Sequence, residues 1–188
     1  GTPMDMTADI GAGGSACPYR WRPMEWEWEG ETYVNERATA TQQTGFWFVA
    51  QARSYLPDAI GGVLWFGVDD AATSALTPDI LRGRPKSLPV FSEENGSLLE
   101  YSDTARSGFF NRVAQFAYLR YNVIGKAVRE NVDAWENEML LKVQEFDEKV
   151  MHSNMSHNRM IREATRFFRR ECTTAVRPME DTGQIPDG

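Results

Sequence analysis

Cysteine and histidine are the side chains here with the widest catalytic repertoire, and the chain has two of each. Cys17 is followed by Arg20 and Arg22, whose charges could lower the pKa of its thiol. A working thiol also needs an adjacent base, and none lies nearby in the sequence, so Cys17 is interpreted as an inert loop residue. Cys172 stands near the end of a predicted helix and is interpreted in the same way. Two thiols alone also cannot define a disulfide framework or a four-ligand zinc site.

The two histidines, His152 and His157, stand five positions apart in a polar stretch. Metal ligands on one helix need a spacing of three or four so that both side chains share a face. A linker between two helices is therefore favoured over a metal site. A serine–histidine–aspartate triad would have to use one of these histidines, which argues against a classical hydrolase wholly contained in this chain. The glycine-rich run at residues 11–14 lacks the lysine of a phosphate loop and follows no strand. We therefore expect neither a metal nor a cofactor.

The composition restricts the class of protein. Hydrophobic residues make up 41% of the 188 positions and charged residues 25%, as in one folded domain or a large part of one. The chain carries 20 basic and 27 acidic residues, a net charge of −7, which disfavours a nucleic-acid partner. No stretch approaches the roughly 20 apolar residues that span a bilayer, so no membrane partner is expected. The start at Gly1 is interpreted as a cut point rather than a native beginning.

Any site must be positioned by helices and strands, and the strands come first. We assign residues 1–102 to a strand-rich part of the domain. Residues 24–37 alternate between aromatic and charged types around Glu29 and Gly30, which predicts a hairpin. Residues 45–53 and 61–68 are dense in aromatic and β-branched types, which predicts two central strands. The loop of about seven residues between them is too short for a parallel crossover, so they should be antiparallel neighbours. Residues 71–102 are broken by prolines and are predicted to be mostly loop.

A helical part follows at residues 103–172, and a flexible tail is expected at 173–188. Apolar residues spaced by three or four run from Val113 to Val150, which predicts one long helix or two nearly collinear ones with a break at Gly125. The pattern returns on a shorter helix from Met160 to Phe168. Strands followed by helices indicate an α+β or layered architecture rather than alternating βαβ units.

Four phrases carry a resemblance to a known family. They are GTPMDMT at residues 1–7, PYRWRP at 18–23, TQQTGFWFVAQARSYLPDAIGGVLWFGVDD at 41–70 and FFNRVAQFAYLRY at 109–121. In order and spacing they resemble the C-terminal half of the cysteine dipeptidases of peptidase family C69. Four ordered matches over about 120 residues are more specific than a single short motif.

The resemblance implies a fold and a chemistry. It implies the antiparallel αββα sandwich of the N-terminal-nucleophile hydrolases, of which this chain would form one part. It also implies a nucleophilic cysteine at the first position of the mature protein, whose own α-amino group accepts the proton. Cys17 is internal and does not fit that role, so the nucleophile would lie upstream and this chain alone would be inactive. An acylase or amidase of the same fold and a non-catalytic scaffold module remain the alternatives.

Within that frame this part would supply walls and polar support to the active site. Arg53 could hold a substrate carboxylate or an active-site acid by a bidentate pair, or else form a structural ion pair with Asp58, Asp69 or Asp70. The polar run Gln42, Gln43 and Thr44 could donate hydrogen bonds near an oxyanion, or could simply be the polar end of a strand. Arg53 and Gln43 are thus the candidate supporting catalytic residues, and Gln42 and Thr44 the candidate substrate-binding residues. The expected partners are dipeptide substrates, the upstream half of the same polypeptide and a second copy in a homo-oligomer.

Overall fold

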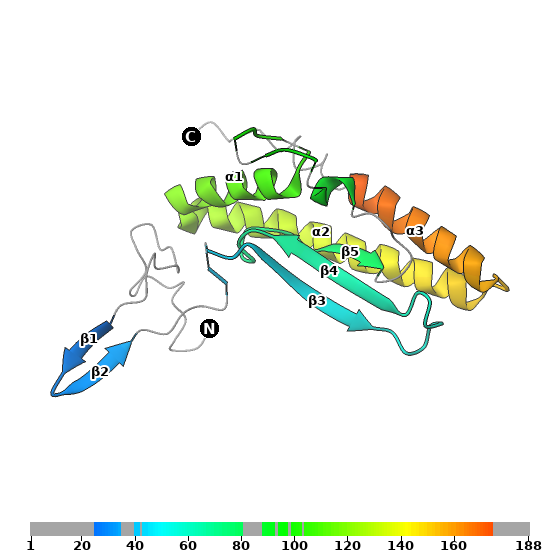
Figure 1. Cartoon of the computed structure of the whole chain (residues 1–188), viewed down its shortest axis with the longest axis horizontal. Helices are drawn as coiled ribbons and strands as arrows, with labels where there is room; N and C mark the ends of the chain where they lie inside the picture. Colours follow the sequence, from blue (N-terminus) through cyan, green and yellow to red (C-terminus); the bar gives the residue numbers. More distant parts are fainter. Residues whose placement is uncertain are drawn as a thin grey trace.

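The computed structural model describes residues 25–34, 40–41, 43–80, 88–92, 94–97, 99–102 and 104–174. These residues form a mixed α+β structure of two antiparallel sheets and three α-helices (Figure 1). Several predicted features lie outside the described residues, namely the loop at residues 1–20 with Cys17, the polar residue Gln42 and the tail beyond residue 174.

The predicted hairpin is confirmed. Strands β1 (Glu25–Trp28) and β2 (Glu31–Val34) pair in an antiparallel register. Between them Glu29 and Gly30 both adopt positive φ angles, 51° and 80°. Two left-handed residues in succession are the geometry of a tight turn whose twist matches that of the flanking strands. Glycine adopts such angles without a steric penalty, which explains why this dipeptide turns the chain here.

The larger sheet has three antiparallel strands in the order β3-β4-β5. Strands β3 (Phe46–Ala52) and β4 (Gly62–Val68) pair along their whole lengths, which confirms the predicted antiparallel neighbours. The prediction of loop at residues 71–102 is wrong for β5 (Thr77–Ile80), and a short 3₁₀ helix, η2 (Pro89–Phe91), follows it. Pro78 suggested a break, but among the described strands β5 pairs only with β4, and a strand at a sheet edge tolerates proline.

The long apolar stripe forms two helices with a sharp corner. They are α1 (Arg106–Leu119) and α2 (Tyr121–Met151), and α3 (His157–Thr174) follows the polar linker. The helix breaks at Arg120, whose φ of −152° is far from helical, and α1 lies beside the first part of α2 (Figure 1). The predicted break at Gly125 is wrong. Gly125 is buried inside α2, where the ring of Tyr121 lies only 3.2 Å from the position that a Cβ would occupy.

The main core lies between one face of the larger sheet and helices α2 and α3. Its buried side chains from the sheet are Val63, Trp65 and Ile80, and those from the helices are Met139, Val143, Phe146, Val150, Ala164 and Phe168. The predicted stripe of α2 is therefore the buried stripe. Phe116 lies on α1 outside this stripe and is 52% exposed.

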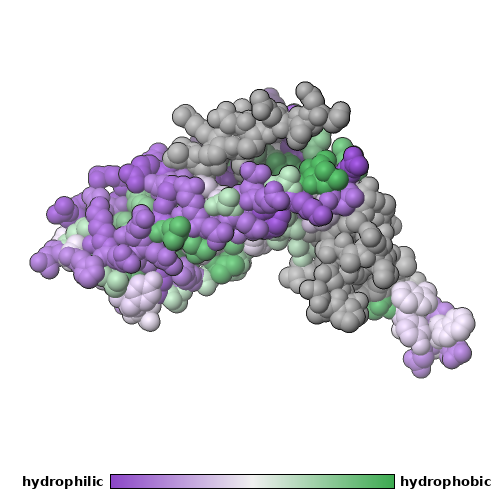
Figure 2. Space-filling model, turned by 180° about the vertical axis from the view of Figure 1, so that it is seen from behind, coloured by the Kyte–Doolittle hydropathy of each residue, from purple (hydrophilic) through white to green (hydrophobic). Residues whose placement is uncertain are grey.

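The opposite face of the larger sheet is apolar and uncovered over much of its area. Side chains alternate along a strand, so Phe46 and Phe48 of β3 project away from the core that Trp65 enters. Phe46 is 63% exposed and Phe48 56% exposed. Seen from behind, the molecule shows hydrophobic patches next to the hydrophilic surface of the helices (Figure 2). Helices α2 and α3 thus cover one face of this sheet. On the other face Phe91 of η2 contacts Phe66, whereas Phe46 and Phe48 remain exposed.

Candidate functional site

Polar residues gather at the end of the larger sheet where β3 begins and β4 ends. The amide of Asp69 donates a hydrogen bond of 3.0 Å to the carbonyl of Gly45, which closes this end of the strand pair. Asp69 itself has a φ of 67°, a left-handed conformation that aspartate adopts more readily than most residues. Its carboxylate accepts bonds from the amide of Asp70 at 2.7 Å and from the side chain of Asn111 at 2.9 Å. The left-handed turn thereby joins the sheet to α1.

Asp70 is a fully buried carboxyl group at the same turn. It accepts a hydrogen bond of 2.5 Å from the hydroxyl of Tyr118 and one of 3.1 Å from the amide of Ala72. Burial raises the pKa of Asp70 above the usual aspartate value, and the bond from Tyr118 opposes part of that rise. The site therefore contains a buried acid that holds its proton to a higher pH than an exposed aspartate would.

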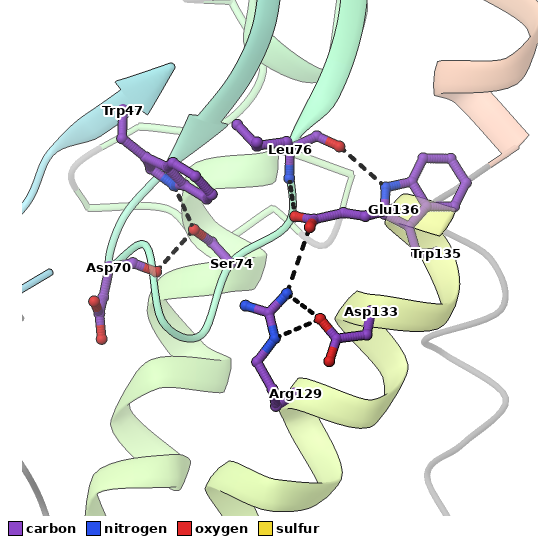
Figure 3. Close-up of polar contacts among 8 residues, drawn as sticks. All are labelled: Trp47, Asp70, Ser74, Leu76, Arg129, Asp133, Trp135 and Glu136. Atoms are coloured by element: carbon purple, nitrogen blue, oxygen red, sulfur yellow. Dashed lines mark hydrogen bonds and ion pairs between the residues drawn. The ribbon is translucent and has the colours of Figure 1, made fainter. Parts of the chain in front are cut away.

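The loop after Asp70 is anchored to the sheet through a tryptophan. The indole of Trp47 donates a bond of 2.9 Å to the hydroxyl of Ser74, which in turn donates one of 2.8 Å to the carbonyl of Asp70 (Figure 3). Trp47 pairs across the strands with Gly67, and a Cβ at Gly67 would lie 2.4 Å from the indole nitrogen. Glycine at this position thus makes room for the indole that holds the loop.

Helix α2 holds the other end of this loop (Figure 3). The amide of Leu76 donates to the carboxylate of Glu136 at 3.0 Å, and the indole of Trp135 donates to the carbonyl of Leu76 at 3.2 Å. Arg129 contacts both Asp133 and Glu136 and so orients the glutamate. The loop from Asp70 to Leu76 is therefore bonded at one end to β3 and at the other to α2, a rigid support for the buried acid.

An open groove of about 920 Å³ adjoins this polar end. It lies between the end of β4, the segment from η2 to Ser102 and one side of α1, and Asn111 lines it while also bonding Asp69. Four aromatic rings lie among the polar and small residues of its lining, and they come from Phe66, Phe91, Tyr101 and Phe116. Its volume is within the range of small-molecule sites, which are commonly apolar with a few polar groups.

Arg53 lies at the other end of β3 and is buried. Its guanidinium pairs with Asp147 of α2 and donates to the carbonyls of Ile60 and Gly61. Tyr55 donates a further bond of 3.1 Å to the same carboxylate. The ion partner is thus Asp147, and none of the three aspartates proposed from the sequence. This arrangement fixes the β3–β4 loop to α2, and a contribution of Arg53 to catalysis stays a prediction.

The structure also separates the candidate residues from one another. Nine positions separate Thr44 from Arg53 along an extended segment, which corresponds to about 30 Å. Thr44 is half-buried and Gln43 exposed at the polar end of the sheet, where backbone amides of both contact Thr41. Arg53 and Thr44 therefore cannot contact one small substrate together. Gln42 lies outside the described residues.

The remaining reactive side chains do not join the polar end of the sheet. Cys172 is buried, and its thiol donates a bond of 3.0 Å to the carbonyl of Pro78. His152 and His157 are exposed on either side of the linker between α2 and α3. Within the described ranges, no three histidine, cysteine or acidic side chains are grouped as a metal ion requires.

Sequence reasoning missed Asp70, Tyr118 and Asn111 as a group. The available signal was the aspartate pair directly after a buried strand, which we interpreted only as a source of partners for Arg53. Asn111 and Tyr118 lie 42 and 48 positions from their aspartate partners, so their contribution depends on how α1 docks.

Comparisons with protein-family models, curated proteins and solved structures gave no match to this chain. Among the described residues, no helix combines the length and apolar composition that a membrane span requires. The class of protein shown by the structure is therefore a mixed α+β protein with a polar sheet end and an adjoining groove, and a more specific function has to be argued from its residues.

Proposed function

We propose that this chain is the C-terminal part of a cysteine dipeptidase of the N-terminal-nucleophile type. The observation that carries the proposal is the larger sheet, which has antiparallel strands, helices on one face and exposed phenylalanines on the other. A sheet of this kind fits one half of an αββα sandwich, in which two sheets pack face to face at about 10 Å. The four ordered sequence phrases support the same family.

In this proposal the upstream part of the polypeptide supplies the second sheet and the nucleophile. The α-amino group of an N-terminal cysteine takes up the proton of its own thiol, the resulting thiolate attacks the carbonyl carbon of the dipeptide, and the leaving amine departs with that proton. Water then hydrolyses the thioester and releases the acyl part as a carboxylate. The part described here contributes the polar sheet end and the groove, which borders the exposed phenylalanines of the sheet through Phe66.

The test is hydrolysis of dipeptides by the longer polypeptide that contains the upstream part. We expect release of free amino acids that alkylation of the N-terminal cysteine abolishes and that chelators leave unchanged. Cys172→Ser should keep turnover within a few-fold of wild type, because its thiol is buried against Pro78. Inhibition by chelators but not by alkylation would refute the cysteine mechanism, and cleavage of N-acyl amino acids in place of dipeptides would identify an acylase instead.

A further inference from the structure

The groove beside the polar sheet end contains two opposite charges in addition to its aromatic rings. Arg112 of α1 and Glu100 of the preceding segment both line it. The guanidinium of Arg112 lies over the ring of Tyr101 at 5.4 Å and over that of Phe116 at 5.8 Å. These distances are within the range of cation–π contacts, which hold the planar group in place without using up its hydrogen-bond donors.

The charges of these two residues are open to a ligand. No ion pair joins either Arg112 or Glu100 to any other described residue, although both side chains lie at the surface of the groove. Other arginines in the described helices, such as Arg129 and Arg166, are paired with acids on their own helix. A guanidinium that is held by two rings and has no acidic partner is suited to a planar carboxylate.

We propose that this groove binds a short zwitterionic peptide with a large apolar side chain, and the inference rests on the proposed dipeptidase function. Arg112 binds the C-terminal carboxylate, Glu100 binds the α-ammonium group, and the rings of Phe66 and Phe91 contact the side chain. One groove that offers both a positive and a negative side chain fits a free dipeptide, which carries both terminal charges, better than a long peptide, whose terminal charges are far apart.

Binding to the full chain, measured by isothermal titration calorimetry, tests the inference without any need for turnover. The probe is alanyl-phenylalanine, and its C-terminal amide is the matched control ligand. We expect the free acid to bind at least tenfold more tightly than the amide, because only the acid supplies a carboxylate to Arg112. Equal affinity for the acid and the amide, or no saturable binding at millimolar peptide, would overturn the inference.

Variants test which residue binds the carboxylate of the ligand and which binds its ammonium group. Arg112→Gln should weaken binding of the acid at least tenfold and leave the amide unchanged, whereas Arg159→Gln, an exposed arginine of α3, should change neither. Glu100→Gln should weaken binding of the dipeptide more than that of N-acetyl-phenylalanine, which has no ammonium group. Circular dichroism of each variant shows whether the fold is kept. If Arg112→Gln retains full affinity while remaining folded, the carboxylate is bound elsewhere.

The outcomes distinguish this inference from the function on which it rests. Selective binding that depends on Arg112, without hydrolysis by the longer polypeptide, would support the groove and contradict the dipeptidase. Dipeptide hydrolysis with a KM that Arg112→Gln leaves unchanged would support the dipeptidase and overturn the groove as its substrate site.

Discussion

At the scale of single residues, Gly67 and Asp70 decide the local geometry of the polar sheet end. Gly67 leaves the space in which the indole of Trp47 crosses the sheet to reach Ser74. Asp70 is buried, yet its carboxyl group has hydrogen-bond partners in Tyr118 and Ala72. Both residues hold the same loop in place. Gly67 has no side chain that would displace the indole, and the buried carboxyl group of Asp70 has its hydrogen bonds satisfied.

Gly67→Ala should destabilise the protein by about 1–3 kcal/mol, because the new methyl group would overlap the indole of Trp47 and displace it from Ser74. Gly45→Ala is the matched control, since a Cβ there meets no atom within 4 Å. Urea denaturation of both variants measures the two changes in the free energy of unfolding. Equal effects at the two glycines would contradict the packing of Trp47 against Gly67.

Asp70 predicts a pH dependence whose sign follows from its raised pKa. The folded state binds this proton more strongly than the unfolded state, so ionisation of Asp70 lowers stability as pH rises from the ordinary aspartate pKa through the folded one. Asp70→Asn removes that loss, since asparagine carries no charge. Relative to wild type, the variant should therefore gain stability between acidic and neutral pH.

The measurement is the free energy of unfolding of both proteins across that range. A stability difference between wild type and Asp70→Asn that does not vary with pH would show that the Asp70 carboxyl group titrates alike in the folded and unfolded chains.

At the scale of elements, α2 is the helix against which the larger sheet is fixed. Its Trp135 and Glu136 hold the loop after β4, and its Asp147 holds the loop between β3 and β4 through Arg53. These contacts lie at opposite ends of the sheet, with the apolar core between them. The helix thus sets the position of both strand ends at once.

Asp147→Ala should cost about 3–5 kcal/mol of stability, because it leaves the buried Arg53 guanidinium without its counter-charge. Asp133→Ala, which breaks an exposed pair with Arg129 on the same helix, should cost less than about 1 kcal/mol. Thermal or chemical denaturation compares the two. If Asp147→Ala lowers the free energy of unfolding no more than Asp133→Ala does, the buried pair does not anchor the loop.

The same pair bears on any test of Arg53 in catalysis. The resemblance predicts that Arg53→Ala lowers kcat/KM by more than tenfold in the longer polypeptide. Since the residue is buried against Asp147, that loss has to be measured where the variant is still folded. The double variant Arg53→Met, Asp147→Leu removes both charges together, so it separates a loss of kcat/KM caused by unfolding from one caused by the missing guanidinium.

At the scale of the whole molecule, the larger sheet has an apolar face on which Phe46 and Phe48 lie exposed, and β3 is at an edge of the described sheet. An apolar face of this kind marks a surface at which another element or chain packs. In the proposed sandwich that element is the second sheet. Without it, the same phenylalanines would promote association between copies of this chain.

Phe48→Glu should therefore reduce self-association and binding of a hydrophobic dye by the isolated chain, with a change in stability below about 1 kcal/mol, because the side chain is 56% exposed. Val123→Glu, a comparably exposed position on α2, adds the same charge away from this face. Light scattering and dye fluorescence compare the two. Equal effects would mean that added charge, and not the sheet face, controls association.

The local pattern of the sequence by itself determined the hairpin, the central strand pair and the buried face of α2, although it missed β5 and misplaced the helix break. Glu29 and Gly30 predicted a turn, the short loop after Ala52 required antiparallel neighbours, and the stripe from Val132 to Val150 is the buried side of α2. Such signals can be recognised in advance because turn geometry, loop reach and helical periodicity act within a few residues.

Tertiary packing decided what each polar residue meets. Arg53 pairs with Asp147, 94 positions away, in preference to the nearer aspartates, and Asp70 meets Tyr118 only because α1 docks against the end of β4. The helix breaks at Arg120 and not at Gly125, which lies buried within α2. Contacts between distant elements depend on how their surfaces fit once folded, and no local pattern contains that information.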